Sequence, residues 1–253
     1  MAKNKGIDVI SITDHDTIDG VRAGQEVADR FNVGFIRGVE LSCSGVPDAH
    51  IIGYAFDLHN EKMITTLSTL AKHRAERNTQ IIDFLKSKNV DIALDEVQAV
   101  EPTTRMLGKP HFAQVLLAKG YVSTLEHAYE KYFNSAKYKE AIKRSKPTSE
   151  EGIDLITQAG GISVLAHPGF LKLEPNAFER YLDNLIANGL LGLECYYSEH
   201  SAEQTEYFIS VAKKRKLLIT GGSDFHGEKY KPGLEMGSVA FDLDTLSHHR
   251  LRG

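Results

Sequence analysis

The sequence predicts an α/β protein with a parallel sheet and a helical insertion. Short apolar runs alternate with longer segments of helical pattern, as in repeated βα units. Polar residues of the metal-ligand type lie at the ends of several of these runs, and a long central segment has no strand pattern. The expected strands are Ile7–Ile12, Gly34–Ile36, His50–Tyr54, Ile162–Ala166, Leu191–Cys195 and Leu217–Thr220.

Helical patterns follow the first strand, fill the centre of the chain and recur near its end. The expected helices span 16–30, 61–87, 111–119, 124–131 and 201–215. Because the centre contains helices without strands, we expect a helical insertion, or cap, at 61–146. The sheet would then belong to a barrel domain made of 1–60 and 147–253.

Composition excludes several classes of protein. The chain has 253 residues and a net charge of −4, so no overall basic field attracts a polynucleotide. Its two cysteines are too few for a disulfide framework and favour buried free thiols in a reducing compartment. No apolar run has the roughly 18 residues of a membrane span, and the start lacks a signal region. We therefore expect a cytoplasmic protein that does not associate with a membrane and has no stable protein partner.

Imidazoles and carboxylates gather at the ends of the expected strands. Three strands are followed by such residues: the first by Asp14, His15 and Asp16, the second by Glu40, and the sixth by Asp224 and His226. His50 opens the third strand, His167 ends the fourth and Glu194 ends the fifth. A lone histidine at such a position is more often a hydrogen-bonded turn residue. Strand ends of a βα barrel meet at one face, however, so side chains of this type at several strand ends indicate a site for divalent metals.

The sequence resembles the polymerase and histidinol phosphatase (PHP) superfamily. The resemblance rests on the motifs Ile-Thr-Asp-His-Asp (12–16), Gly-Val-Glu (38–40), His-Ile-Ile-Gly (50–53), Ala-His-Pro-Gly (166–169) and Gly-Ser-Asp-Phe-His (222–226). Lys-Pro-His-Phe-Ala (109–113) and Tyr-Ser-Glu-His-Ser (197–201) are similar to the nucleotide phosphoesterase branch, which includes RNase AM-like enzymes. That branch also has a helical insertion.

The resemblance implies a distorted (β/α)7 barrel that holds up to three divalent ions of manganese, zinc or iron. It implies that Glu40 bridges the first and second ions, His50 and His167 complete the second, Asp224 binds the first, and His15 and His226 bind the third. Asp14 and Asp16 fit a supporting role that orients imidazoles, or are turn residues.

The family pattern begins with a strand carrying His-x-His and, shortly after it, Ser-Asp-Gly. This sequence contains neither. We therefore expect an N-terminally truncated barrel that lacks its first strand, with two ligands left at the first metal, Glu40 and Asp224. A truncated gene or a protein fragment explains this better than an evolved variant. We also expect these 253 residues to be nearly inactive alone.

The expected reaction is hydrolysis of nucleotide phosphates, such as 3′,5′-bisphosphate nucleotides or short RNA from its 5′ end, by metal-activated water. Candidate catalytic residues are Glu40, Asp224 and His200. Candidate substrate-binding residues are Arg74, Arg77, Lys109, His111 and His200. The two arginines share a helix face, where they would clamp a phosphate or be solvated. Alternatives are a histidinol-phosphate-type phosphomonoesterase and a non-catalytic metal-binding remnant.

Overall fold

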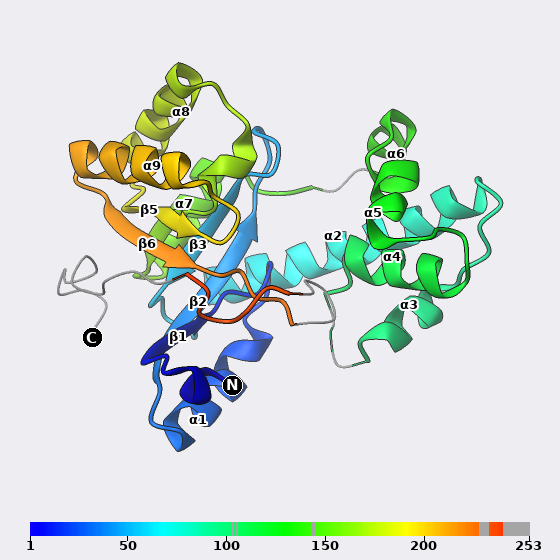
Figure 1. Ribbon diagram of the computed structural model, residues 1–253, viewed down its shortest axis with the longest axis horizontal. Helices are drawn as coiled ribbons and strands as arrows, with labels where there is room; N and C mark the ends of the chain where they lie inside the picture. The colour runs from blue at the N-terminus through cyan, green and yellow to red at the C-terminus, as the bar shows by residue number, and fades with distance from the viewer. Residues whose placement is uncertain (103, 105, 143–144, 228–232, 240–253) are drawn as a thin grey trace. The chain divides into compact units, whose positions relative to one another are not determined.

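The computed structural model describes residues 1–102, 104, 106–142, 145–227 and 233–239 (Figure 1). The chain divides into two compact units. The first contains residues 1–65 and 146–253, and the second contains residues 66–145. Each unit has its own hydrophobic core, so each can be described by itself.

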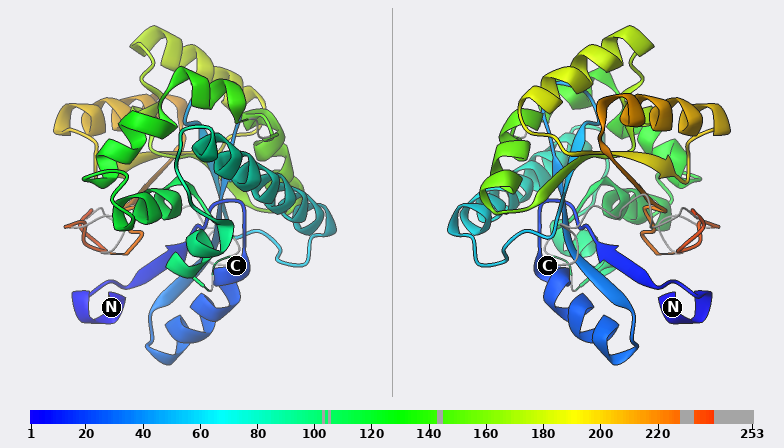
Figure 2. Two further views of the ribbon diagram at one scale, coloured as in Figure 1. Left: turned by 90° about the vertical axis from the view of Figure 1, so that its right-hand side faces the viewer. Right: turned by 90° about the vertical axis from the view of Figure 1, so that its left-hand side faces the viewer.

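The first unit is built on one curled sheet of six strands with helices against it (Figures 1 and 2). The strands lie in sequence order: β1 (Val9–Ile12), β2 (Gly34–Ser42), β3 (His50–Tyr54), β4 (Ile162–Leu165), β5 (Gly192–Tyr197) and β6 (Leu218–Gly222). The helical elements are η1 (Ala2–Lys5), α1 (Asp19–Arg30), α7 (Ser149–Gln158), η3 (Pro168–Leu171), α8 (Pro175–Ala187) and α9 (Ala202–Arg215). The predicted α/β fold class is confirmed.

The direction of β3 corrects the predicted parallel sheet. β3 runs antiparallel to both β2 and β4, whereas β1–β2, β4–β5 and β5–β6 are parallel pairs. Only residues 43–49 connect β2 to β3, and a parallel pair would need a crossover of a dozen or more residues. As a result Ser42 at the end of β2 pairs with His50 at the start of β3. His50 therefore lies at the same edge of the sheet as the carboxyl ends of the parallel strands.

β2 is longer than the sequence predicts. It extends from Gly34 to Ser42, so Glu40 lies inside the strand and not after it. Val39 and Leu41, its neighbours in the strand, are fully buried in the core. Because side chains alternate along a strand, Glu40 points to the opposite face from both of them. A carboxylate is thereby fixed on the rigid backbone of a central strand.

A glycine allows α7 to approach the sheet closely. A Cβ atom at Gly53 of β3 would lie 2.9 Å from Cγ1 of Ile156 on α7. The helix buries Ile153 and Ile156 completely against the strands. Helix α7 therefore covers one face of β3.

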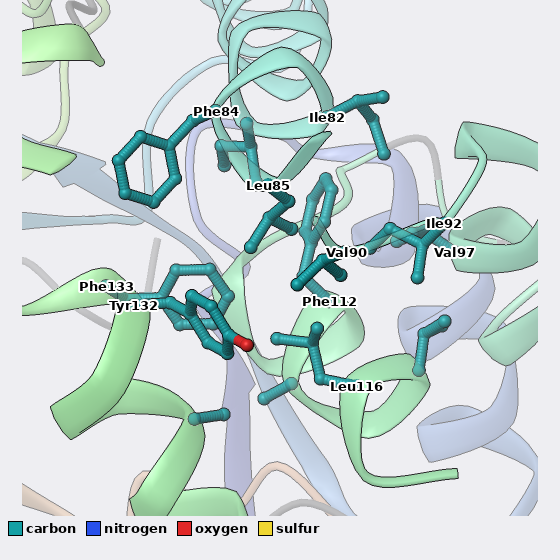
Figure 3. Packing of buried hydrophobic residues seen from close by; sticks show 14 of the residues in the cluster. Ile82, Phe84, Leu85, Val90, Ile92, Val97, Phe112, Leu116, Tyr132 and Phe133 are labelled. Atoms are coloured by element: carbon teal, nitrogen blue, oxygen red, sulfur yellow. The ribbon is translucent and has the colours of Figure 1, made fainter. Parts of the chain in front are cut away.

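In the second unit, the described secondary structure consists of helices joined by loops. It contains most of α2 (Glu61–Lys86), followed by α3 (Leu94–Val100), α4 (Lys109–Ala118), α5 (Leu125–Ala128), the π-helix η2 (Tyr129–Phe133) and α6 (Ala136–Ala141). Its core is a cluster in which Leu85, Phe112, Leu116 and Phe133 pack together (Figure 3). Among the described residues of the whole chain, no helix combines the length and apolar character needed to cross a membrane.

Both cysteines are buried and unpaired. Burial raises the pKa of the Cys43 thiol and of the Cys195 thiol to about 12. At pH 8 both thiols are therefore protonated, and only a thiolate attacks a disulfide reagent. We expect the folded protein to react with Ellman's reagent at pH 8 far more slowly than the protein unfolded in urea. Cys43→Ser and Cys195→Ser variants assign any fast reaction, and stoichiometric labelling within seconds in the folded state would contradict the buried placement.

Candidate metal centre

The loop after β1 is held against β2 by backbone pairing. The backbone N–H of Glu40 donates to the carbonyl of Asp14 at 3.1 Å, and the N–H of Asp16 donates to the carbonyl of Glu40 at 2.9 Å. These bonds continue the parallel pairing of β1 and β2 beyond the end of β1. They place His15 directly beside Glu40.

Asp16 anchors this loop through its side chain. Its carboxylate is fully buried and accepts hydrogen bonds from the backbone N–H of Ser42 at 2.8 Å and from the Ser42 hydroxyl at 3.0 Å. Asp16 has a φ of 56°, a left-handed conformation that is uncommon for residues other than glycine. The two hydrogen bonds hold that conformation and so fix the turn that presents His15.

Glu40, His50 and His167 converge on one point. Oε1 of Glu40 lies 2.8 Å from Nδ1 of His50 and 2.9 Å from Nε2 of His167, and these two nitrogens lie 3.2 Å apart. Ligand atoms about 2.1 Å from one metal, at right angles to each other, would be about 3.0 Å apart. The three side chains therefore fit a shared divalent ion, and one oxygen with two nitrogens is a donor set that zinc, manganese and iron accept.

The second oxygen of Glu40 faces a different imidazole. Oε2 lies 3.4 Å from Nδ1 of His15, and ligand atoms of His15, Glu40 and His50 all lie within 4.8 Å of one another. The ring centroid of His15 is 6.3 Å from that of His226. The carboxylate of Glu40 therefore presents Oε1 to His50 and His167 and Oε2 to His15, an arrangement that a ligand shared by two ions would need.

The imidazoles keep Glu40 ionised. Burial alone would raise the pKa of Glu40, but the positive potential of His15 and hydrogen bonds from His167 and His50 hold it well below its usual range. His167 shows the reciprocal effect: burial lowers the pKa of its imidazole, but the hydrogen bond and charge of Glu40 raise it overall. The centre thus stabilises a buried negative charge on Glu40 that a cation can use.

Asp224 and His226 follow β6 and lie close to each other. Nδ1 of His226 is 2.8 Å from the carbonyl of Asp224 and 3.3 Å from its Oδ1. The other carboxylate oxygen, Oδ2, accepts a hydrogen bond from the hydroxyl of Tyr197 at 3.0 Å. Asp224 has a φ of 50°, so the chain turns sharply at this residue. Tyr197 fixes the orientation of a carboxylate that the sequence pattern assigned to metal binding.

Glu194 supports the backbone of His167. It is buried at the carboxyl end of β5, and its Oε2 accepts a hydrogen bond from the backbone N–H of His167 at 2.7 Å. His167 itself has a φ of 24°, outside the regions that L-residues usually occupy. Burial raises the pKa of Glu194 to about 8 despite the opposing influence of His167. Glu194 thus accepts the backbone hydrogen bond that fixes the position of His167.

The sequence assigned no role to Tyr197, and it placed Glu194 only among the ligand-type side chains at the strand ends. Tyr197 opens the Tyr-Ser-Glu-His-Ser segment, and Glu194 ends a strand of otherwise apolar residues. A carboxylate in such a strand was the available signal for Glu194. Its partner is a backbone amide 27 residues away, and a local pattern cannot identify that partner.

The predicted substrate-binding residues of the insertion lie in the second unit. Arg74 and Arg77 are buried, so a solvated helix face does not describe them. Arg77 donates from Nη2 to the carbonyl of Leu107 at 3.1 Å. Nζ of Lys109 lies 5.3 Å from the centre of the Tyr138 ring. Nδ1 of His111 accepts a hydrogen bond at 3.0 Å from the backbone N–H that precedes its own helix. Their contact with substrate stays a prediction.

His200 is held by backbone groups on both ring nitrogens. Nδ1 lies 3.0 Å from the carbonyl of Cys195 and must donate to it, since a carbonyl only accepts. Nε2 then accepts from the backbone N–H of Gly169 at 3.2 Å. Burial lowers the pKa of this imidazole, which favours the neutral form that both bonds require. A catalytic role for His200 stays a prediction, and it would require one of these bonds to open.

Comparison with known proteins identifies the class. No family model matches the sequence. A solved structure of a metal-dependent phosphoesterase from Bifidobacterium adolescentis is 31% identical, with a TM-score of 0.85, and the match covers 97% of this chain and 86% of that one. A 3′,5′-nucleoside bisphosphate phosphatase from Chromobacterium violaceum is 28% identical over 86% of this chain and 76% of that protein. A 5′-3′ exoribonuclease from Haemophilus influenzae is 28% identical over 88% and 80%, respectively.

The fold, the convergent imidazoles and carboxylates, and these similarities define a metal-dependent phosphoesterase, a hydrolase of phosphoric esters. The chain belongs to the metal-dependent phosphoesterases, which agrees with the resemblance of its motifs to the PHP superfamily.

Glu194→Ala should weaken metal binding by roughly 10–100-fold, the cost typical of losing a group that orients a ligand. The reason is that the backbone N–H of His167 loses its acceptor and the imidazole loses its fixed position. Glu194→Gln should retain most of the affinity, because the amide oxygen can still accept that bond. Calorimetric titration with Mn²⁺ measures both, with Glu206→Ala on the exposed face of α9 as the control. Equal affinities for Glu194→Ala and the control would show that Glu194 does not position His167.

Proposed function

We propose that this protein hydrolyses nucleotide phosphates, namely 3′,5′-bisphosphate nucleotides or short RNA from its 5′ end. The observation that carries the proposal is the bridging geometry of Glu40, with one oxygen facing His50 and His167 and the other facing His15. The nucleotide class is supported by the relatives, one a nucleoside bisphosphate phosphatase and another an exoribonuclease.

The described side chains fit more than one divalent ion. Glu40, His50 and His167 would hold one ion, and Glu40 with Asp224, and His15 with His226, would contribute to neighbouring positions. Nδ1 of His167 is buried and has no hydrogen-bond partner among the described residues, so its imidazole is held by Nε2 and by its backbone. When bound, divalent ions supply Lewis acidity that stabilises charge on the phosphoryl oxygens and lowers the pKa of water.

The protein's own groups set the geometry of the reaction. The ionised carboxylate of Glu40 lies at the point where the imidazoles converge in a largely buried site. The Tyr197 hydroxyl holds Asp224 in one orientation, and Glu194 does the same for the backbone of His167. Holding several polar groups in place before the substrate arrives reduces the reorganisation that the transition state requires. The arginines and Lys109 of the second unit are the proposed phosphate-binding cations.

The substrate class can be tested with a panel of phosphate esters in the presence of Mn²⁺. We expect adenosine 3′,5′-bisphosphate and 5′-phosphorylated RNA to release product at least about tenfold faster per enzyme than histidinol phosphate, because only they present a nucleotide to a nucleotide site. Phosphate release and calorimetric binding are measured in parallel, so that a slowly reacting protein still reports its preference. Tighter binding and faster turnover of histidinol phosphate would favour the sugar-like phosphomonoesterase instead.

Glu40→Gln should abolish both turnover and metal retention. The amide keeps the shape of the side chain but removes the charge that the imidazoles and the ions share. Metal content after dialysis, measured by plasma mass spectrometry, should fall from the parent's value towards zero, and the phosphate release of the parent, however slow, should be lost. Glu206→Gln, an exposed change on α9, is the control. A metal content of about zero in the parent protein itself would favour the non-catalytic remnant.

A further inference from the structure

The second unit contains a basic cavity that the proposed reaction does not use. It has a volume of about 510 Å³ and is lined by Lys88, Lys131, Lys137, Tyr121 and Tyr132, among others. Binding sites for drug-sized ligands and cofactors typically occupy roughly 300–1,000 Å³. No Asp or Glu is among the residues described as lining it. The cavity therefore has the size of a nucleotide and the charge that an anion requires.

The three lysines come from different parts of the helical unit. Lys88 follows the end of α2, Lys131 belongs to η2, and Lys137 lies in the first turn of α6. A cation near a helix C-terminus is favourable on its own, so the helix end accounts for Lys88. It does not account for Lys137, since a cation in the first turn of a helix is unfavourable. The three lysines therefore line one cavity, although no single feature of the helices explains the position of all three.

One of these lysines is fixed in position. Nζ of Lys131 donates to the carbonyl of Tyr121 at 3.1 Å and lies 5.2 Å from the ring centre of Tyr132. An ammonium has three N–H donors, so donors remain for an anion. Tyr121 is half-buried, and its hydroxyl accepts a hydrogen bond from the backbone N–H of Asp91 at 3.0 Å. An anchored cation beside a fixed aromatic ring is the combination that binds single-stranded nucleic acid by phosphate contact and base stacking.

Charge is divided unequally between the two units. Residues 66–145 contain thirteen Lys and Arg against nine Asp and Glu, a net charge of +4. The remaining residues contain seventeen against twenty-five, a net charge of −8. The overall charge of −4 is therefore distributed unevenly, and the second unit taken by itself is basic.

We infer that this basic cavity binds a phosphate-bearing segment of single-stranded RNA, separate from the nucleotide at the metal centre. The inference rests on the proposed function, since it identifies RNA as the substrate class that gains from this second contact. A mononucleotide substrate has no further nucleotides for the cavity to bind. Affinity for RNA would then depend on the cavity, and affinity for a bisphosphate nucleotide would not.

Binding of a fluorescein-labelled, 5′-phosphorylated twelve-residue uridine RNA tests the inference. Fluorescence anisotropy is measured with EDTA, so no hydrolysis occurs, at several salt concentrations. Replacing Lys88, Lys131 and Lys137 together by Gln should weaken binding at least about tenfold. Each lost phosphate contact on a single strand lowers the slope of log affinity against log salt by about 0.7, so the slope should fall by about 2. The affinity for adenosine 3′,5′-bisphosphate with Mn²⁺ should not change.

A matched triple variant controls for charge and for folding. Lys213, Lys214 and Lys216 are exposed at the end of α9 in the other unit, and their replacement by Gln removes the same charge. Equal weakening by the two triple variants, or no RNA binding by the parent protein, would overturn the inference. Competition by polyglutamate as strong as by unlabelled RNA would also overturn it, because the cavity would then bind anions without regard to bases. Failure of the proposed function shows separately, as absent hydrolysis of the bisphosphate nucleotide.

Discussion

The buried carboxylate of Glu40 is the interaction on which the rest of the site depends. A carboxylate with this little exposure would normally take up a proton, because desolvation disfavours its charge. The imidazoles of His15, His50 and His167 reverse that tendency and keep the pKa of Glu40 low. They reach it from a loop, an antiparallel strand and a strand end. The topology of the sheet therefore brings these three imidazoles together around one buried carboxylate.

The sequence was informative about residue types and strand positions, and less so about directions. All six strands occur where apolar runs predict them, and the fold class follows from their alternation with helices. The direction of β3 was wrong because apolar runs carry no sign of direction, although the short connection at 43–49 was a usable signal. Glu40 was placed after β2 because the apolar run breaks at Arg37, whereas pairing with β3 extends the strand to Ser42. Tertiary pairing overrides local composition there.

The supporting contacts could not be predicted, since each joins residues remote in the chain. The hydroxyl of Tyr197 bonds Asp224, and the carboxyl of Glu194 bonds the backbone of His167. Neither contact produces a periodicity or a residue spacing that can be recognised in the sequence. The same holds for the basic cavity, whose lysines lie at three separate places in the helical unit. Motifs identify the residues that touch a ligand, whereas the contacts that hold them require the folded chain.

Backbone conformation adds a last constraint on the site. Asp16, His167 and Asp224 all have positive φ, a conformation that costs of order 1–3 kcal/mol for such residues. Each occupies a segment that presents a candidate ligand, and hydrogen bonds from Ser42 to Asp16 and from His167 to Glu194 offset part of the cost. Without those bonds the turns could relax to ordinary conformations and the imidazoles would separate. The strained turns and their buried hydrogen-bond partners therefore help to position the imidazoles around Glu40.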